Sequence, residues 1–260
     1  MILLFDIGNT HTHLGLADDR RVLKQANIPT LTWFGGGAAA LIKEFSGENK
    51  ITGAVLCSVV PRATPRVQKT IRSAWKISAL ELNARTVSGV GIDYPKPTSI
   101  GPDRLANAVA ARQRFGAPVV VVDFGTAVTF DVVDARGNYI GGIIAPGLAA
   151  MTDYLHEKTA LLPKIEIREI KSAVGKSTEE AMLVGAVHGY RGLVRELIAE
   201  LKRELRVKKL PVVATGGYAK LIAAKLPEIS AVAPDLTLEG LRLERQHQVA
   251  RPHLKPASIS

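Results

Sequence analysis

The sequence has one cysteine, few aromatic residues and no long apolar run. Because Cys57 is alone, the chain can form no internal disulfide, and we expect a protein of the reducing cytoplasm. No apolar run approaches the roughly 20 residues that a membrane-spanning helix needs, and Asp6 interrupts the first apolar stretch too early for a signal peptide. The sequence therefore predicts a soluble, cytoplasmic protein that binds no membrane.

Cys57 lies in the apolar run 54–60, with no basic residue or histidine beside it. A thiol in such surroundings is more often a small buried side chain than a nucleophile. We therefore expect Cys57 to be buried and unreactive.

The chain carries a net charge of +10, while aromatic residues make up only 5% of it. Its densest basic run, residues 202–209, includes an acidic residue, and few aromatic side chains are present on which bases could stack. We interpret this run as a solvated helix end and expect no nucleic-acid partner. The excess positive charge still favours anionic ligands such as nucleotides and carboxylic acids.

The segment from Pro118 to Gly147 contains the clearest structural signal. Val119–Val122 predicts a strand buried on both faces, and this strand ends at Asp123. Gly125 permits a tight turn before a second strand at residues 127–133, and Gly137 with Asn138 predicts the next reversal. A carboxylate and a glycine thus lie in a turn between antiparallel strands, where main-chain N–H groups can point at a ligand.

The N-terminus repeats this pattern of strand, turn, strand and turn. When the sequence is aligned with itself at an offset of 117 residues, Asp6 aligns with Asp123, Gly8 with Gly125 and Asn9 with Thr126. Two unrelated turns could share an Asp-x-Gly tripeptide, but the shared context favours a duplicated domain. We therefore expect two halves, at residues 1–115 and 116–245, followed by a disordered tail at 246–260.

Strands and helices alternate along the rest of the chain, which indicates an α/β architecture. A helix is expected at residues 104–115 with Asp103 at its N-cap. Asp103 is either only a helix cap or a catalytic base beside the guanidinium of Arg104. The strand at 210–214 leads into Gly216 and Gly217, which either admit a flat ligand or form an ordinary tight turn.

Taken together, these motifs resemble the type III pantothenate kinases of the actin, Hsp70 and sugar-kinase superfamily. The matching segments run in order from residue 6 to residue 241: Asp6–Thr10, Ser58–Pro61, Tyr94, Gly101–Arg104, Asp123–Asp131, Gly141–Gly147, Thr178, Thr215–Gly217 and Asp235–Leu241. The resemblance implies an α/β fold of duplicated ribonuclease H-like (actin-like ATPase) domains, each a mixed sheet flanked by helices, with a cleft between them. It also implies ATP-dependent phosphorylation of pantothenate to 4′-phosphopantothenate, the first step of coenzyme A biosynthesis.

The resemblance assigns roles to particular residues. Those that would touch ATP are Asp6, Ile7, Gly8, Asn9, Thr10, His11, Thr12, His13 and Thr126. Those that would bind pantothenate are Tyr94, Gly101, Pro102, Asp103, Arg104 and Thr178. Asp103 would be the general base, Asp6 would lie near Mg²⁺ and the phosphates, and Asp123 would hold a monovalent cation, K⁺ or NH₄⁺. The family also implies a homodimer, in which Thr178 can come from the partner subunit.

The residue chemistry agrees with these roles. Phosphoryl transfer needs positioned donors and cations around the phosphates more than covalent chemistry from the protein. An alcohol is a poor nucleophile until a carboxylate accepts its proton, and Arg104 can bind an anionic group through two parallel hydrogen bonds.

The sequence departs from the family pattern at Pro102, at Tyr218 and at the pair His11 and His13. None of these departures removes a group that the mechanism uses. The two histidines lie two residues apart on one strand face, but a zinc site is not expected because no third ligand is near in sequence.

Two other functions stay open at this stage. One is a kinase-like accessory or transcriptional regulatory protein of the same family, which the basic character would suit. The other is a chaperone-like ATPase of the wider superfamily, although the small size and the Gly101–Arg104 loop argue against it.

Overall fold

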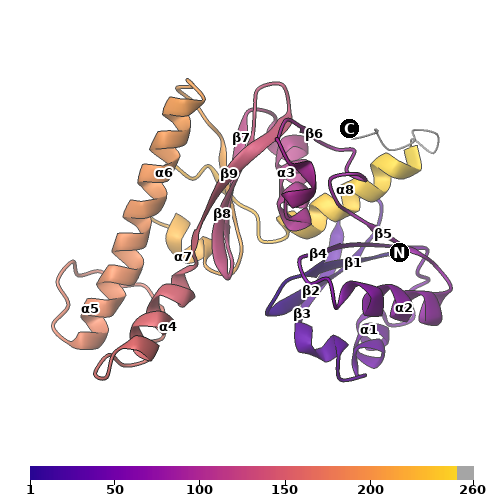
Figure 1. The fold of residues 1–260 in the computed structure, drawn as a ribbon, viewed down its shortest axis with the longest axis horizontal. Helices are drawn as coiled ribbons and strands as arrows, with labels where there is room; N and C mark the ends of the chain where they lie inside the picture. The colour runs from indigo at the N-terminus through magenta and orange to yellow at the C-terminus, as the bar shows by residue number, and fades with distance from the viewer. Residues whose placement is uncertain (251–260) are drawn as a thin grey trace. The chain divides into compact units, whose positions relative to one another are not determined.

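The computed structural model describes residues 1–250 and divides the chain into two compact units. The first unit contains Met1–Gly116, Gly137–Ile140 and residues 235–250, and the second contains Ala117–Arg136 and Gly141–Pro234. Figure 1 labels their helices and strands. Within residues 1–250, no helix is long and apolar enough to cross a membrane.

The first unit is built on a five-stranded sheet with the order β3-β2-β1-β4-β5. Its strands are β1 (Ile2–Ile7), β2 (His11–Ala17), β3 (Val22–Pro29), β4 (Gly53–Ser58) and β5 (Ala79–Glu81). The remaining elements are η1 (Thr30–Trp33), α1 (Ala38–Ser46), α2 (Thr64–Trp75), β6 (Gly91–Ile92), η2 (Pro97–Ser99), α3 (Pro102–Phe115) and α8 (Leu236–Ala250). β1 pairs antiparallel with β2 and parallel with β4, so the sheet is mixed.

Alternation along β1 divides the core of this unit between the two faces of the sheet. Leu3, Phe5 and Ile7 pack with residues of α1 and α2, whereas Ile2 and Leu4 pack with residues of α3 and α8. Because side chains alternate along a strand, Asp6 projects from the same face as Ile2 and Leu4. Asp6 therefore lies on the side of the sheet that α3 and α8 cover.

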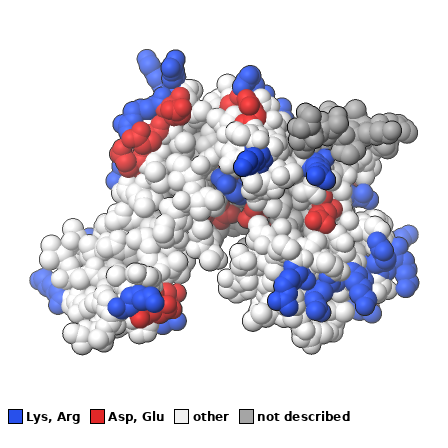
Figure 2. Space-filling model, viewed as in Figure 1, with Lys and Arg blue, Asp and Glu red and all other residues white. Residues whose placement is uncertain are grey.

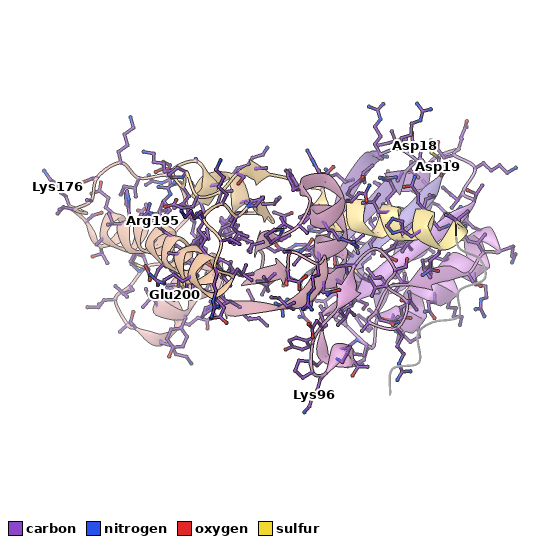
Figure 3. The ribbon with its side chains drawn as sticks, turned by 90° about the horizontal axis from the view of Figure 1, so that it is seen from above. Asp18, Asp19, Lys96, Lys176, Arg195 and Glu200 are labelled. Carbon is purple, nitrogen blue, oxygen red and sulfur yellow. The ribbon has the colours of Figure 1, made fainter. Side chains whose placement is uncertain are left out.

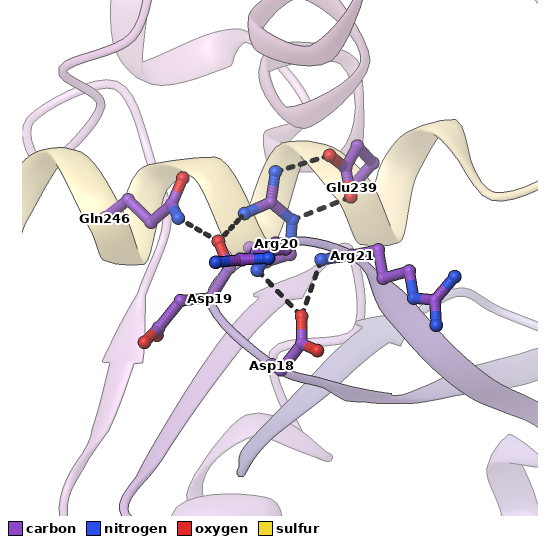
Figure 4. Close-up of polar contacts among 7 residues, drawn as sticks. Asp18, Asp19, Arg20, Arg21, Glu239 and Gln246 are labelled. Atoms are coloured by element: carbon purple, nitrogen blue, oxygen red, sulfur yellow. Dashed lines mark hydrogen bonds and ion pairs between the residues drawn. The ribbon is translucent and has the colours of Figure 1, made fainter.

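The polar turn between β2 and β3 forms hydrogen bonds with α8 (Figure 4). Asp18 Oδ1 accepts hydrogen bonds from the main-chain N–H of Arg20 and Arg21, each at 2.7 Å, and these bonds hold the pKa of Asp18 below its ordinary value. Arg242 of α8 donates to the carbonyl oxygen of Asp19 at 2.6 Å. These contacts connect α8 to the turn that joins β2 and β3.

The second unit is built on a sheet in which β9, β8, β7, β10 and β11 are neighbours in that order. Its strands are β7 (Val119–Phe124), β8 (Ala127–Val133), β9 (Asn138–Pro146), β10 (Val212–Thr215) and β11 (Ala231–Val232). Its helices are α4 (Leu148–Lys158), α5 (Thr178–Val184), η3 (Gly185–Gly189), α6 (Tyr190–Glu204) and α7 (Ala219–Ala223). The first residues of β9 belong to the first unit, where Gly91 and Ile92 of β6 pair with them.

The predicted duplication is confirmed by the strand orders. The order β3-β2-β1-β4-β5 in the first sheet is repeated as β9-β8-β7-β10-β11 in the second. β1 and β7 have the same length and the same burial pattern, and Asp6 and Asp123 each occupy the fifth position. The turn between the paired strands is one residue shorter in the second copy, so the offset of 117 holds only as far as Gly8 and Gly125.

The C-terminal region differs from the expected disordered tail. Residues 246–250 continue α8, and Gln248 donates to the carbonyl oxygen of Thr86 at 3.0 Å. This packing explains why a polar segment is helical here. The rest of the expected tail, residues 251–260, lies outside the described residues.

The basic run at residues 202–209 includes the end of α6, as expected. Arg203 pairs with Glu196 at 3.1 Å and also with Glu200, all exposed side chains. A different basic surface covers α2, where Figure 2 shows Lys and Arg gathered. Its exposed cations are Arg62, Arg66, Lys69, Arg72 and Lys76, and no acidic residue lies between positions 62 and 76.

Candidate functional site

Asp6 lies near the carboxyl end of β1, between two strands that place a polar side chain on each side of it. The strand register pairs Asp6 with His13 of β2 and with Cys57 of β4. The Cys57 thiol donates a hydrogen bond to Asp6 Oδ1 at 3.4 Å, and His13 Nδ1 lies 3.9 Å from Asp6 Oδ2. Burial and the nearby His11 hold the pKa of His13 below its ordinary value. Asp6 is thus a partly buried carboxylate with defined neighbours.

The turn after Asp6 is anchored by residues that the sequence did not single out. Gly8 N donates to the carbonyl oxygen of His11 at 3.0 Å, and this closes the turn around Asn9 and Thr10. Thr30 Oγ1 donates to the carbonyl oxygen of Gly8 at 2.7 Å, and Thr30 N donates to that of Thr10 at 3.0 Å. Asn9 and Thr10 are exposed at the tip.

Two of the residues expected to touch ATP turn their side chains into the core. Ile7 is fully buried. Thr12 is fully buried as well, with its hydroxyl 3.1 Å from Thr30 Oγ1 and accepting from Trp33 Nε1 at 3.0 Å. Only the main chain of Ile7 and Thr12 can contact a nucleotide.

Asp103 lies inside α3 and does not cap it, so the predicted N-cap was wrong. The N-cap is Gly101 and the helix begins at Pro102, because proline suits the first helical position. Asp103 Oδ1 accepts from Arg104 N at 2.9 Å, and a Cβ on Gly101 would lie 2.5 Å from the same oxygen. Burial raises the pKa of Asp103, which the hydrogen bond from Arg104 N only partly offsets. The structure therefore presents a carboxylate of increased basicity.

Three side chains lie together near the first turn of α3, which carries Arg104. The guanidinium of Arg104 lies over the ring of Tyr139, 5.7 Å from its centroid, and Tyr94 packs edge-on against the same ring at 6.2 Å. Tyr139 is buried, and it was missed by the sequence analysis because its role depends on a contact distant in sequence. Lys96 extends from the same loop into solvent (Figure 3). Arg104 and Tyr94 thus both contact the ring of Tyr139.

Cys57 is a neighbour of Asp6, and Asp103 also acts on it electrostatically. It is fully buried, as predicted, and burial together with Asp6 and Asp103 raises the pKa of its thiol well above the ordinary value. Asp6 and Asp103 are therefore near enough to one buried atom for each to act on it electrostatically.

In the second unit, Asp123 occupies the position equivalent to that of Asp6. It is paired in register with Thr129 of β8 and with Thr215 of β10. The turn that follows is closed by Gly125 N, which donates to the carbonyl oxygen of Ala127 at 3.1 Å. Gly125 and Thr126 are both exposed in this turn.

Two glycines let other segments approach this turn. A Cβ on Gly147 would lie 2.2 Å from the carbonyl oxygen of Thr126, and a Cβ on Gly216 would lie 2.5 Å from Asp123 Oδ1. Gly216 also has a φ of +88°, whereas a Cβ on Gly217 would meet nothing within 4 Å. The sequence left open whether these two glycines admit a flat ligand or form an ordinary tight turn. Gly216 forms a tight turn that packs closely against β7, whereas Gly217 faces open space.

Thr178 lies in the second unit as the first residue of α5. Ser177 is the N-cap and accepts from Glu180 N at 3.2 Å, while Lys176 N donates to Glu180 Oε2 at 2.7 Å. Thr178 is exposed, and the side chain of Lys176, two residues earlier in the sequence, points outward in Figure 3.

The carboxylates of Asp6 and Asp123 suit cations whose other ligands are largely the phosphate oxygens of a nucleotide. No group of three or more His, Cys, Asp or Glu side chains able to hold a metal is found in residues 1–250. Mg²⁺ keeps several waters and is commonly held by one or two carboxylates together with phosphate oxygens, so Asp6 alone fits that role. The carboxylate of Asp123 is a hard oxygen donor of the kind that monovalent cations accept.

Comparison with known proteins gives the family. The model of the type III pantothenate kinase family matches residues 2–200. A type III pantothenate kinase from Akkermansia muciniphila is 47% identical over 251 residues, covering 93% of this chain and 96% of its own. One from Thermomicrobium roseum is 40% identical over 258 residues, covering 95% and 98%.

Solved structures support the fold alone. A conserved putative Baf family transcriptional activator from Campylobacter jejuni matches with a TM-score of 0.55 and 17% identity, covering 97% of this chain and 100% of its own. A putative N-acetylmannosamine kinase from Listeria monocytogenes matches with a TM-score of 0.52 and 12% identity, covering 97% and 99%. The predicted α/β fold of two mixed sheets flanked by helices is confirmed. By the family model and these relatives, the chain belongs to the type III pantothenate kinase family.

Proposed function

We propose that this protein transfers the γ-phosphoryl group of ATP to the primary hydroxyl of pantothenate and forms 4′-phosphopantothenate, the first step of coenzyme A biosynthesis. The observation that carries the proposal is that Asp6 lies on the face of the first unit's sheet that α3 covers, and that α3 carries Asp103 in its first turn. The carboxylate of Asp103 suits the acceptor alcohol, and the carboxylate of Asp6 suits the Mg²⁺ ion and the phosphates.

Asp103 is the general base. Its carboxylate accepts the hydroxyl proton as the oxygen of pantothenate attacks the γ-phosphorus, and the bond to the ADP oxygen breaks. Because burial raises the pKa of Asp103, the carboxylate is a stronger base than one in water.

Pantothenate is held by the groups around Asp103. Arg104 binds the pantothenate carboxylate, and its position over the Tyr139 ring limits the orientations of the guanidinium. Tyr94, Gly101 and Pro102 form the wall of this site. Thr178, from the same subunit or from the partner in a homodimer, adds a hydroxyl.

In the first unit, we assign ATP binding to the turn from Asp6 to His13. In the second unit, we assign a contact with the nucleotide phosphates to Thr126. Asp6 would hold Mg²⁺ together with phosphate oxygens, and Asp123 would hold K⁺ or NH₄⁺. When bound, these ions neutralise negative charge on the phosphates. The exposed tip at Asn9 and Thr10 is accessible to the phosphates, and Thr30 keeps the tip in place. We further infer that the enzyme acts in the cytoplasm.

A coupled assay of ADP release tests this function directly. The assay should be run with pantothenate and Mg·ATP, first with K⁺ or NH₄⁺ and then with Na⁺ as the only monovalent cation. We expect pantothenate-dependent ADP release with K⁺ or NH₄⁺ and much less with Na⁺. ADP release that is independent of pantothenate would contradict the proposal and favour a chaperone-like ATPase.

A regulatory protein of the same family is the second candidate. The basic surface over α2 is the feature that favours it, because its five cations have no acidic neighbour on that helix. Retention on DNA that weakens steeply with salt, without pantothenate phosphorylation, would support this candidate instead.

A further inference from the structure

Cys57 and Asp6 are neighbours on adjacent parallel strands. β1 and β4 pair in register, so both side chains project from the face that α3 and α8 cover. The thiol of Cys57 is fully buried and lies 3.4 Å from Asp6 Oδ1. It is the only cysteine of the chain.

The direction of this hydrogen bond is fixed by chemistry. An ionised carboxylate only accepts hydrogen bonds, whereas a thiol can donate one, so the proton lies on Cys57. The end of an aspartate side chain rotates in a broad torsional well. A donor on the β4 side therefore keeps Oδ1 directed toward β4, and Oδ2 stays on the side of β2, 3.9 Å from His13 Nδ1.

The second unit also has a small hydrogen-bond donor next to its aspartate. β10 takes the place of β4 in the strand order, and Thr215 takes the place of Cys57 beside Asp123. Thr215 is also buried, with 2% of its surface exposed. Both copies of the fold thus place a small side chain that carries one donor hydrogen next to the aspartate.

We propose that Cys57 is a positioning residue for ATP binding, because its thiol holds the carboxylate of Asp6 in the orientation that receives Mg²⁺ and the phosphates. The proposal rests on the proposed function for the role of Asp6. The hydrogen bond itself can be tested without it.

Infrared spectroscopy of the full chain without nucleotide tests the hydrogen bond. A single cysteine gives a single S–H stretching band, so no other thiol obscures it. We expect this band at lower frequency in the wild type than in Asp6→Ala, because hydrogen bonding weakens the S–H bond. The same band position in both proteins would overturn the proposal, whether or not the protein phosphorylates pantothenate.

Substitutions of Cys57 test the consequence for ATP. Cys57→Ala should weaken binding of a non-hydrolysable ATP analogue with Mg²⁺, measured by calorimetry, by about three- to tenfold. The KM for ATP should rise by a similar factor, with the KM for pantothenate unchanged. Cys57→Ser should restore most of the affinity, since a hydroxyl can also donate to Asp6 Oδ1.

Val55→Ala is the matched control, because Val55 is a fully buried residue on the same face of β4, two positions from Cys57. It should lower thermal stability without weakening binding of the analogue. Equal weakening by Val55→Ala, or wild-type affinity in Cys57→Ala, would overturn the proposal. If the wild type binds Mg²⁺ and the analogue but does not phosphorylate pantothenate, the proposed function fails, while the calorimetry still decides the role of Cys57.

Discussion

The main-chain N–H of Arg104 donates a hydrogen bond to Oδ1 of Asp103 at 2.9 Å, inside the first turn of α3. Such a bond favours the ionised carboxylate, yet burial has the larger effect and raises the pKa of Asp103 above its ordinary value of 3.8. The base proposed for the acceptor alcohol is therefore protonated at a higher pH than an exposed aspartate.

This shift predicts the acid limb of the pH–rate profile. We expect kcat/KM for pantothenate to fall as the pH drops through a value above 3.8, because protonated Asp103 cannot accept the hydroxyl proton. The profile should be measured with circular dichroism at each pH to confirm that the protein stays folded. A profile that remains flat down to pH 3.8 in folded protein would contradict the assignment of the base.

Asp103→Asn should separate activity from stability. We expect kcat to fall by about 10²- to 10⁴-fold with little change in ATP affinity. A carboxyl whose folded-state pKa is raised contributes stability below its unfolded pKa, and this contribution is lost as the pH rises through the folded-state pKa. At pH 7 the asparagine variant should therefore be at least as stable as the wild type in a thermal melt. A large drop in Tm would mean that Asp103 is mainly structural.

Gly216→Ala and Gly217→Ala form a matched pair beside Asp123. At Gly216 an added Cβ would lie 2.5 Å from Asp123 Oδ1, at a φ of +88°, so we expect a loss of about 1–3 kcal/mol in unfolding free energy. At Gly217 an added Cβ meets nothing within 4 Å, and the change should be within about 0.5 kcal/mol. Chemical denaturation measures both. Equal effects would show that close packing at Gly216 is not what this turn requires.

Glu244 should be a strong determinant of stability. It is fully buried on α8 and accepts from Gly89 N at 2.6 Å and from Ser88 Oγ at 2.9 Å. Glu244→Gln replaces one acceptor oxygen by an NH₂ group that faces these donors, so we expect a loss of about 2–3 kcal/mol. Gln248→Ala, which removes a neighbouring bond to Thr86 O, should cost about 1 kcal/mol or less. Similar melting temperatures for the two variants would contradict the prediction that Glu244→Gln is the more destabilising substitution.

Much of the fold was predictable because its signals are local. The apolar runs before Asp6 and Asp123 predicted the two central strands, and the repeated turns predicted the duplication that the strand orders confirm. The helix start was missed by a short distance because Pro102 can occupy the first helical position, which moves the cap to Gly101.

The unpredicted features depend on contacts between distant segments. Cys57 has no charged neighbour in sequence, and its partner Asp6 lies 51 residues away. Thr30 anchors the Gly8 turn from 22 residues away, and nothing in its own segment indicates this. The end of α8 is polar, but contacts such as that of Gln248 with Thr86 keep it helical. Sequence patterns report periodicity and turn chemistry, and they do not report such partners.

The most direct test of the proposed activity identifies the product. The full chain should be incubated with pantothenate, Mg·ATP and K⁺, and the products analysed by mass spectrometry, with Asp103→Asn run in parallel. We predict one 4′-phosphopantothenate for each ADP formed, and almost none from the variant. ADP without a phosphorylated pantothenate, or equal product from Asp103→Asn, would contradict the proposed reaction or its base.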